Sequence, residues 1–144
     1  MKFWWSGEVD GEVGDSYREA CNEIEPAING IIGPKHYGTQ LLEWAFIGII
    51  LRPAFATDFP FKEIKKWHRK ELCAEFRLKI DYSKFRESNG LGKRHLICLA
   101  LLRSLRLMSD LHIDKSSIDA LSKDFYELAV GNGWLTAGDV EYKT

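Results

Sequence analysis

Residues 71–82 show the clearest alternation of hydrophobic and polar positions in the chain. Side chains on a strand alternate between its two faces. A period of two therefore predicts a strand with one face in the core and one face that is mostly charged. Residues 61–68 are a weaker strand candidate, which Arg69-Lys70 would join to it as a hairpin. The core positions are Leu72, Ala74, Phe76, Leu78, Ile80 and Tyr82, and the opposite positions are Cys73, Glu75, Arg77, Lys79 and Asp81.

Two further strands are predicted upstream. Residues 2–9 are rich in aromatics and contain the adjacent Trp4 and Trp5, which a strand places on opposite faces. One tryptophan is then expected in the core, and its neighbour covers the other sheet face or its edge. The continuous apolar run from Trp44 to Leu51 is typical of a strand that is buried on both faces.

Apolar residues recur at intervals of three and four in three other segments, which predicts amphipathic helices. The first covers 15–33, with Asp15 as a potential cap and Gly33-Pro34 as its end. The second covers 91–111. The third begins near Ser116 and ends at residues 131–133, where two glycines flank an asparagine.

The order of these segments predicts an α+β fold. We expect a single domain, residues 1–144, with a small antiparallel or mixed sheet of three to four strands. About three helices should pack mainly on one face of this sheet. A chain of 144 residues is long enough to bury a substantial core.

The chain is expected to be soluble and cytoplasmic. Its first residues lack the apolar stretch of a secretory signal, and the longest apolar run, 44–51, is far too short to span a bilayer. The cysteines are Cys21, Cys73 and Cys98, an odd number with wide spacing, which argues against a disulfide framework or a zinc site. Each lies on an apolar or amphipathic segment, so we expect buried, inert thiols.

Charge is unevenly distributed along the sequence, although the net charge is only −1. Acidic residues dominate up to residue 34, and basic residues dominate from 62 to 106. The acidic third would suit a basic partner. An ordinary exposed helix face carries similar acids, so both interpretations stay open at this point.

No recognised catalytic motif is present, and we expect neither an enzyme nor a cofactor or metal. The four histidines are not paired at ligand spacing. The most enzyme-like stretch is Glu75–Lys79, because alternation places Glu75, Arg77 and Lys79 on one strand face, as in metal-dependent nucleases. Such a nuclease needs a second carboxylate, and Asp58 is the candidate just upstream. A solvated face with cross-strand ion pairs explains the same residues.

The basic stretch Lys62–Lys70, which contains Trp67, is the candidate for nucleic-acid binding. Lysines neutralise phosphates, and an aromatic ring stacks on a base. The sequence pI of about 6.4 is low for a dedicated nucleic-acid binder. An edge strand guarded by lysines explains these residues without a ligand, so we expect no direct contact with nucleic acid.

Six short stretches of the chain carry a family resemblance. They are Phe3-Trp4-Trp5-Ser6-Gly7-Glu8, Tyr17-Arg18-Glu19-Ala20, Tyr37-Gly38, Trp44-Ala45-Phe46-Ile47, Phe76-Arg77-Leu78-Lys79-Ile80-Asp81 and Arg103-Ser104. In this order they resemble the immunity protein 44 family of bacterial polymorphic toxin and contact-dependent growth inhibition systems. None of these stretches is catalytic.

The resemblance implies a small cytoplasmic α+β protein that is encoded beside a secreted toxin. Such a protein binds the toxic C-terminal domain and neutralises it by stoichiometric occlusion of its active site. If the toxin is a nuclease, its basic nucleic-acid groove suits an acidic face, and no membrane partner is expected. The candidate partner-binding residues are then the acids of the N-terminal third, Glu8, Asp10, Glu12, Asp15, Glu19 and Glu23.

Overall fold

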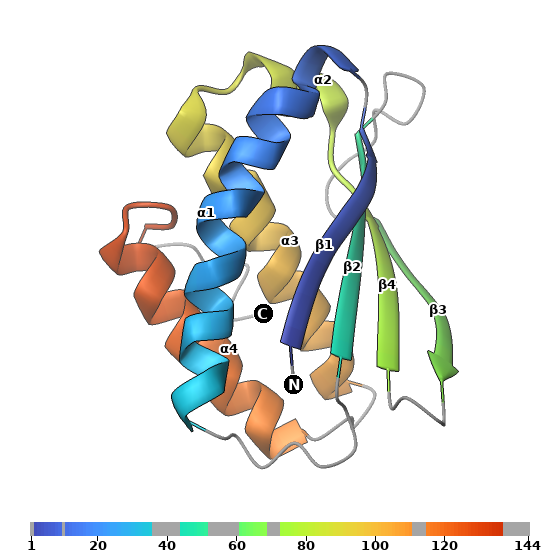
Figure 1. The fold of residues 1–144 in the computed structure, drawn as a ribbon, viewed down its shortest axis with the longest axis vertical. Coiled ribbons are helices and arrows are strands. Elements are labelled where there is room, and N and C mark those ends of the chain that lie inside the picture. Colours follow the sequence, from blue (N-terminus) through green and yellow to red (C-terminus); the bar gives the residue numbers. More distant parts are fainter. Residues whose placement is uncertain are drawn as a thin grey trace.

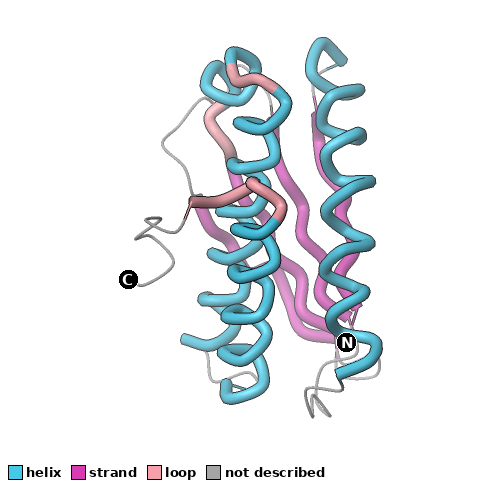
Figure 2. Tube along the Cα trace, turned by 90° about the vertical axis from the view of Figure 1, so that its left-hand side faces the viewer, coloured by secondary structure: helices cyan, strands magenta, loops and turns pink. Residues whose placement is uncertain are grey.

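The computed structural model describes the backbone of residues 2–9, 11–35, 44–51, 61–68, 73–110 and 115–136, and the side chains of residues 11–31, 80–110 and 115–136. The helices lie on one side of the strands, so the domain has two layers (Figure 1, Figure 2). The elements in chain order are β1 (Lys2–Val9), α1 (Gly11–Lys35), β2 (Trp44–Leu51), β3 (Phe61–His68), β4 (Cys73–Lys79), α2 (Tyr82–Glu87), α3 (Gly90–Asp110) and α4 (Lys115–Gly131).

The four strands form one mixed sheet in the order β1-β2-β4-β3. β1 pairs with β2 in parallel, and β2 pairs with β4 in parallel. Helix α1 connects the first parallel pair, because parallel neighbours need a crossover connection. β3 pairs with β4 antiparallel and forms one edge of the sheet, with a register shift between Ile64 and Lys66.

The strand register divides the sheet residues between two faces, because directly paired residues share a face. One face carries the row Trp5, Ile47, Phe76 and Ile64 and is almost entirely apolar. Ile80 directly follows β4 and, by alternation, continues the face that carries Phe76. Because Ile80 is fully buried, we assign this inner face to the side of the helices. The outer face carries Lys2, Trp4, Ser6, Glu8, Trp44, Phe46, Gly48, Ile50, Phe61, Glu63, Lys66, His68, Cys73, Glu75, Arg77 and Lys79. Trp4 and Trp5 therefore belong to opposite faces.

The helical layer has a continuous apolar core in the described part of the chain. Helix α1 contributes one apolar stripe. This stripe is buried because an apolar helix face is removed from water only when another element packs over it. The fully buried residues include Ile24 and Ile28 of α1, Ile97 and Leu101 of α3, and Phe125 of α4. Phe85 of α2 is also fully buried and lies with its ring centroid 6.5 Å from that of Tyr17.

The prediction of an α+β fold with about three helices is wrong for the part of the chain whose side chains the structure describes. The residues with described side chains are almost entirely helical and contain no strand; they form four helices rather than about three. The core described above is therefore an all-helical one, and the strands lie outside this part of the chain. The prediction also extended the fourth strand to Tyr82. Instead Asp81 caps α2, and its Oδ1 accepts a hydrogen bond from the backbone N–H of Lys84 at 3.1 Å.

Helix α1 also differs from its predicted bounds. It begins at Gly11 rather than Asp15 and runs to Lys35, past Gly33-Pro34. The earlier start follows from Val13, which is 2% exposed and extends the buried stripe by one turn. Pro26 lies inside the helix on its exposed side, where water can satisfy the carbonyl that has lost its backbone partner.

The prediction of buried thiols is confirmed for Cys21 and Cys98, which are free and buried. Burial raises the pKa of the Cys21 thiol to about 12. Burial likewise raises the pKa of Cys98. Both groups stay protonated at neutral pH, so they pack as small hydrophobes. Cys73 lies on β4, outside the described side chains.

The chain folds back on itself at the end of α4 through a left-handed turn at Gly133. Gly133 has φ +77°, and the backbone N–H of Trp134 donates to the carbonyl of Ala129 at 2.9 Å. This turn buries Trp134 and Leu135, which are both 3% exposed. The carbonyl of Trp134 lies 3.1 Å from Nδ1 of His95 on α3.

Replacing Gly133 with alanine should lower the free energy of unfolding by about 1–2 kcal/mol, because an L-residue is strained in the left-handed region. Gly131→Ala is the matched control. Gly131 ends the helix with open space around its Cβ position, so alanine there should stabilise by up to about 1 kcal/mol. Urea unfolding of both variants tests this. Equal effects of the two substitutions would contradict the role assigned to the turn.

Asp119 links α4 to the end of α3. Its Oδ1 accepts a hydrogen bond from Oγ of Ser109 at 2.6 Å, and its Oδ2 accepts one from Nζ of Lys115 at 3.0 Å. The Ser109 hydrogen bond, together with Lys115, holds the pKa of Asp119 below its ordinary value and outweighs the opposing effect of burial. The carboxylate side chain is 51% exposed, so solvent screening limits its contribution to stability.

Asp119→Asn should therefore destabilise the fold by about 1 kcal/mol at pH 7. A depressed pKa in the folded state stabilises above the unfolded pKa of about 3.9, and this stabilisation is lost as pH falls through the folded value. The gap between wild type and variant should thus close below about pH 4. Unfolding curves at pH 7, 5 and 3 measure it, with the exposed Asp110→Asn as control. A gap that is constant with pH would refute the linkage.

Candidate functional site

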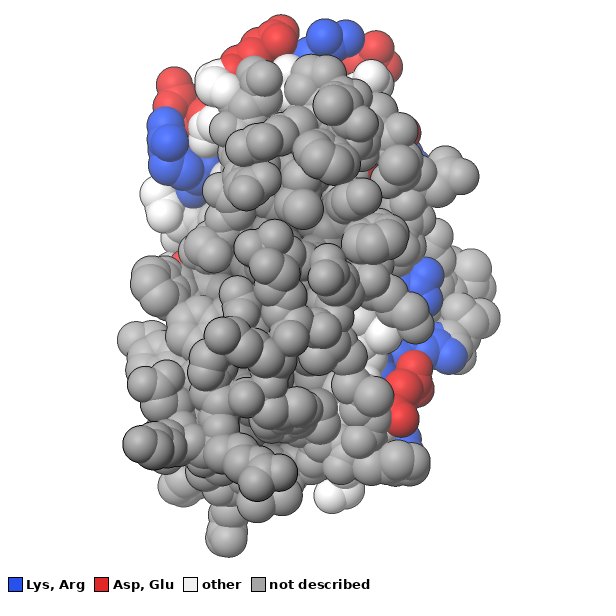
Figure 3. All heavy atoms as spheres, turned by 90° about the vertical axis from the view of Figure 1, so that its right-hand side faces the viewer, with Lys and Arg blue, Asp and Glu red and all other residues white. Residues whose placement is uncertain are grey.

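Charged residues gather at the end of the molecule formed by the start of α1 and by α2. Figure 3 shows acidic and basic atoms adjoining one another at this end. The basic residues at this end come from the range 62–106, in which basic residues dominate the sequence. Two of them lie over aromatic rings. The Arg86 guanidinium is 5.8 Å from the centroid of Tyr82, and Nζ of Lys93 is 5.8 Å from that of Phe85.

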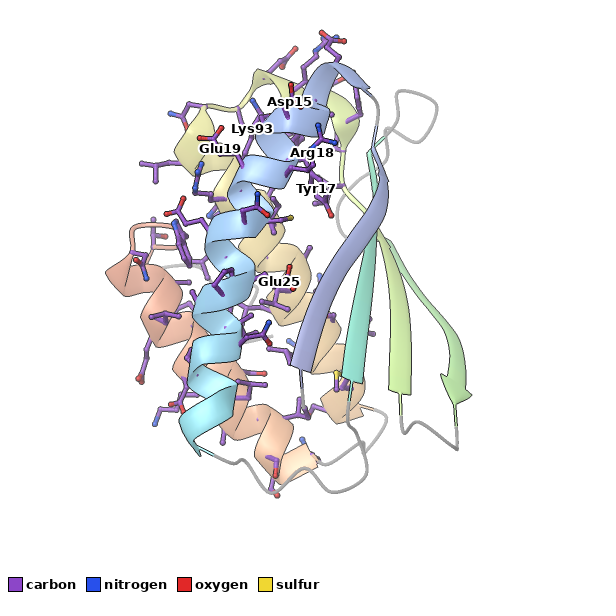
Figure 4. All side chains as sticks on the ribbon, in the orientation of Figure 1. Asp15, Tyr17, Arg18, Glu19, Glu25 and Lys93 are labelled. Carbon is purple, nitrogen blue, oxygen red and sulfur yellow. The ribbon has the colours of Figure 1, made fainter. Side chains whose placement is uncertain are left out.

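Four of the predicted partner-binding residues form one line along α1, which we call the acidic stripe: Glu12, Asp15, Glu19 and Glu23. Their spacing of three, four and four residues keeps them within about 80° of the helix circumference. All four are exposed, and they lie on the side of α1 opposite the buried stripe. Figure 4 shows Asp15 and Glu19 on the first turns of the helix, with Arg18 between them in sequence.

Three members of the acidic stripe already have partners within the chain. Asp15 forms an ion pair with Arg18. Oε2 of Glu23 accepts a hydrogen bond from Nε of Arg94 at 2.7 Å, and the Arg94 side chain is only 15% exposed. Oε2 of Glu12 accepts one from the Tyr82 hydroxyl at 3.1 Å. Glu19 is exposed and forms no ion pair with any other described side chain, so it is accessible to an incoming partner.

The other two predicted residues do not join the acidic stripe. Glu8 lies on β1, where its register position opposite Ile50 places it on the outer face of the sheet. Asp10 lies outside the described residues. The structure therefore divides the predicted set between a helix and a sheet face. Arg18, which follows Glu8 by ten residues, forms its ion pair with Asp15 on α1.

Sequence reasoning missed the residues that hold the acidic stripe in place. Arg94 and Tyr82 are 71 and 70 residues away from Glu23 and Glu12, and no local pattern connects such distant positions. It also missed Leu91, a large apolar residue that is 57% exposed at the start of α3. The sequence did contain a sign of this exposed residue, because Leu91 lies ahead of the apolar stripe of the helix predicted over 91–111.

The nuclease-like residues Glu75, Arg77 and Lys79 all lie on the outer face of the sheet. Their register partners on β3 include opposite charges, since Lys66 is paired with Glu75 and Glu63 with Arg77. This is the arrangement expected for cross-strand ion pairs. The second carboxylate of the nuclease hypothesis, Asp58, lies outside the described residues.

The basic stretch Lys62–Lys70 falls largely on β3, which is an edge strand. An edge position with a register shift and several lysines is a common means of preventing strand pairing between molecules. No group of three metal-binding side chains occurs within residues 11–31, 80–110 and 115–136. None of the described helices is both long enough and apolar enough to cross a membrane.

Comparison with curated proteins and with solved structures gave no significant match. The sequence model of one family, described as immunity protein 44, matches residues 1–130. This match includes all four strands and nearly all of α4, the helix for which the sequence resemblance offered no stretch. Because the match covers most of the chain and ends just before the turn at Gly133, the chain belongs to the immunity protein 44 family.

Proposed function

We propose that this immunity protein binds the toxic C-terminal domain of a secreted toxin encoded beside it and neutralises that domain in the cytoplasm. The single observation that carries this proposal is the family match over residues 1–130. The mechanism is stoichiometric: one folded inhibitor covers one active site, and no chemical step by the inhibitor is needed.

The acidic stripe is the proposed contact surface for a toxin whose active site is basic, such as a nuclease. A row of exposed carboxylates on one helix steers a cationic groove toward the inhibitor. Glu19 supports this role most directly, because its charge is not paired within the described part of the chain. Glu23 is held rigidly by Arg94, so it reaches a partner with little loss of side-chain entropy.

Leu91 offers an apolar contact on α3, the helix whose Arg94 donates a hydrogen bond to Glu23. It lies at the start of α3, three residues before Arg94, and is more than half exposed. Specific inhibitor complexes combine such apolar positions with a polar rim and bury on the order of 1,200–2,000 Å² in total. The start of α1 and the start of α3 together provide both kinds of residue.

Co-expression with the toxic domain encoded immediately upstream tests the function. We expect growth to be rescued and a one-to-one complex to be recovered by affinity purification. An unrelated toxin domain serves as the specificity control, and a catalytically dead form of the cognate domain allows the complex to be isolated without killing the cell. Continued growth arrest by an active toxin, with folded inhibitor present, would refute the proposal.

A further inference from the structure

The loop that follows α4 turns back onto the helices and adds to their apolar core (Figure 2). We call residues 132–136 the strap. Trp134 and Leu135, in the middle of the strap, are buried as deeply as core residues within the helices. At its far end, the carbonyl of Thr136 accepts a hydrogen bond from the hydroxyl of Tyr126 at 3.1 Å. The strap is therefore a fixed part of the fold rather than a loose continuation of α4.

The strap contacts the first turns of α3 through His95, which lies 39 residues before Trp134 in the chain. Nδ1 of the imidazole is 3.1 Å from the carbonyl oxygen of Trp134. A carbonyl oxygen can only accept a hydrogen bond, so Nδ1 carries the proton in this contact. The ring is partly buried, which limits the competition from water for the same proton. One hydrogen bond with a defined donor thus ties α3 to the strap.

The preceding residue, Arg94, ties the same turn of α3 to the acidic stripe. Its Nε donates to Oε2 of Glu23 at 2.7 Å, and its Nη1 donates to the carbonyl of Gly90 at 2.9 Å. A Cβ atom on Gly90 would lie 3.3 Å from Nη1, so the guanidinium is closely packed against the helix start. Successive residues differ by about 100° around a helix axis. Arg94 and His95 therefore hold one turn of α3 from two different sides.

We propose that the strap and His95 position Arg94 against Glu23 and so set the geometry of the acidic stripe. The first turn of a helix lacks intrahelical partners for its N–H groups and frays unless other contacts hold it. At α3 one such contact is the cap, in which Oδ1 of Asn89 accepts from the backbone N–H of Gly92 at 2.7 Å. The strap adds a contact from the side, supported by the buried Trp134.

The path between the strap and the acidic stripe is short. Trp134 bonds to His95, His95 is covalently next to Arg94, and Arg94 bonds to Glu23. A single helical turn moves as a unit, so opening of the strap should loosen both side chains together. The family match ends at residue 130, so the strap supplies this support from outside the matched range. The coupling belongs to the free chain, and only its consequence for toxin binding rests on the proposed function.

Two substitutions of His95 test the coupling in the full-length protein. The readout is the rate at which the Arg94 Nε proton exchanges with water, measured by NMR, because this proton is the one donated to Glu23. His95→Leu removes the donor and should speed this exchange by about 10-fold. His95→Asn should restore the rate to within about twofold of the wild type, because Nδ2 of asparagine is as many bonds from Cβ as Nδ1 of histidine.

Trp134→Ala should have a larger effect, on the order of 100-fold, because it removes the side chain that anchors the strap. Lys123→Ala, at an exposed position of α4, is the control and should leave the rate unchanged. The two His95 variants decide the question even if Trp134→Ala does not fold. An Arg94 Nε proton that exchanges at the wild-type rate in His95→Leu overturns the proposal. So does an equal acceleration in His95→Leu and His95→Asn, which would mean that the hydrogen bond to the strap is not what matters.

Binding to the toxic domain tests the consequence separately. We expect His95→Leu to dissociate from a catalytically dead toxin domain about 10-fold faster than the wild type, and His95→Asn to match the wild type. Unchanged dissociation of His95→Leu would show that the strap does not act on the contact surface. A wild type that forms no complex would instead contradict the proposed function, and the exchange rates would still decide whether the strap positions Arg94.

Discussion

Replacing Phe125 with alanine is expected to lower the free energy of unfolding by about 3–5 kcal/mol, the usual cost of removing a fully buried aromatic side chain. Phe125 is fully buried on α4, which packs against α3 and α1. A domain of this size is stable by only about 5–15 kcal/mol. The variant should therefore populate unfolded molecules and protect cells poorly against the toxin.

Chemical unfolding followed by tryptophan fluorescence measures the loss, and growth in the presence of the toxin measures its consequence. Lys123→Ala is the matched control, because Lys123 is exposed on the same helix and should change stability by no more than about 0.5 kcal/mol. A Phe125→Ala protein as stable as the control would show that α4 is not part of the core.

Reversing two charges of the acidic stripe, Asp15→Lys with Glu19→Lys, is expected to slow association with a basic toxin domain by about 10- to 100-fold at low salt. These two positions are chosen because Glu12 and Glu23 accept hydrogen bonds from Tyr82 and Arg94, so their replacement would disturb the fold. Removing Asp15 breaks only an exposed ion pair with Arg18, which contributes little to stability.

Stopped-flow or surface-based kinetics at two salt concentrations gives the measurement. The control variant, Asp110→Lys with Glu127→Lys, makes the same change in net charge at exposed positions of α3 and α4. Steering by the acidic stripe predicts a large effect of the first variant that shrinks as salt is added, and a small effect of the control. Equal effects would mean that net charge alone matters. No effect of either would remove the acidic stripe from the interface.

Much of the local structure was predictable, because its signals lie within a few residues of one another. Period-two alternation at 72–80 and the aromatic stretch 2–9 correspond to β4 and β1. Spacing by three and four residues located α1, α3 and α4. The residues at which these strands and helices begin and end were predicted less accurately. Tyr82 continues the alternation of the strand and also begins α2, and only the hydrogen bond at Asp81 shows where the strand pattern stops.

The candidate site was predictable only in part, for a similar reason. Negative charge on the first helix could be read from the residue types, and the helical period aligns Glu12, Asp15, Glu19 and Glu23 on one side. Nothing in the sequence separates Glu8 from this group, since it is only four residues from Glu12. The strand register places it on the outer face of the sheet, so that nearness in sequence does not become nearness in space.

The sequence by itself determined which residues face water and which face the core within each helix and strand, since that depends on local periodicity. It also carried enough of the family pattern to indicate an immunity protein. Only the tertiary structure decided which faces meet. It brought Arg94 to Glu23 and Tyr82 to Glu12 across about 70 residues, and it aligned Glu75 and Arg77 with Lys66 and Glu63. Contacts between distant segments depend on how whole elements pack, and the net packing energy is a property of the assembled core rather than of any short stretch.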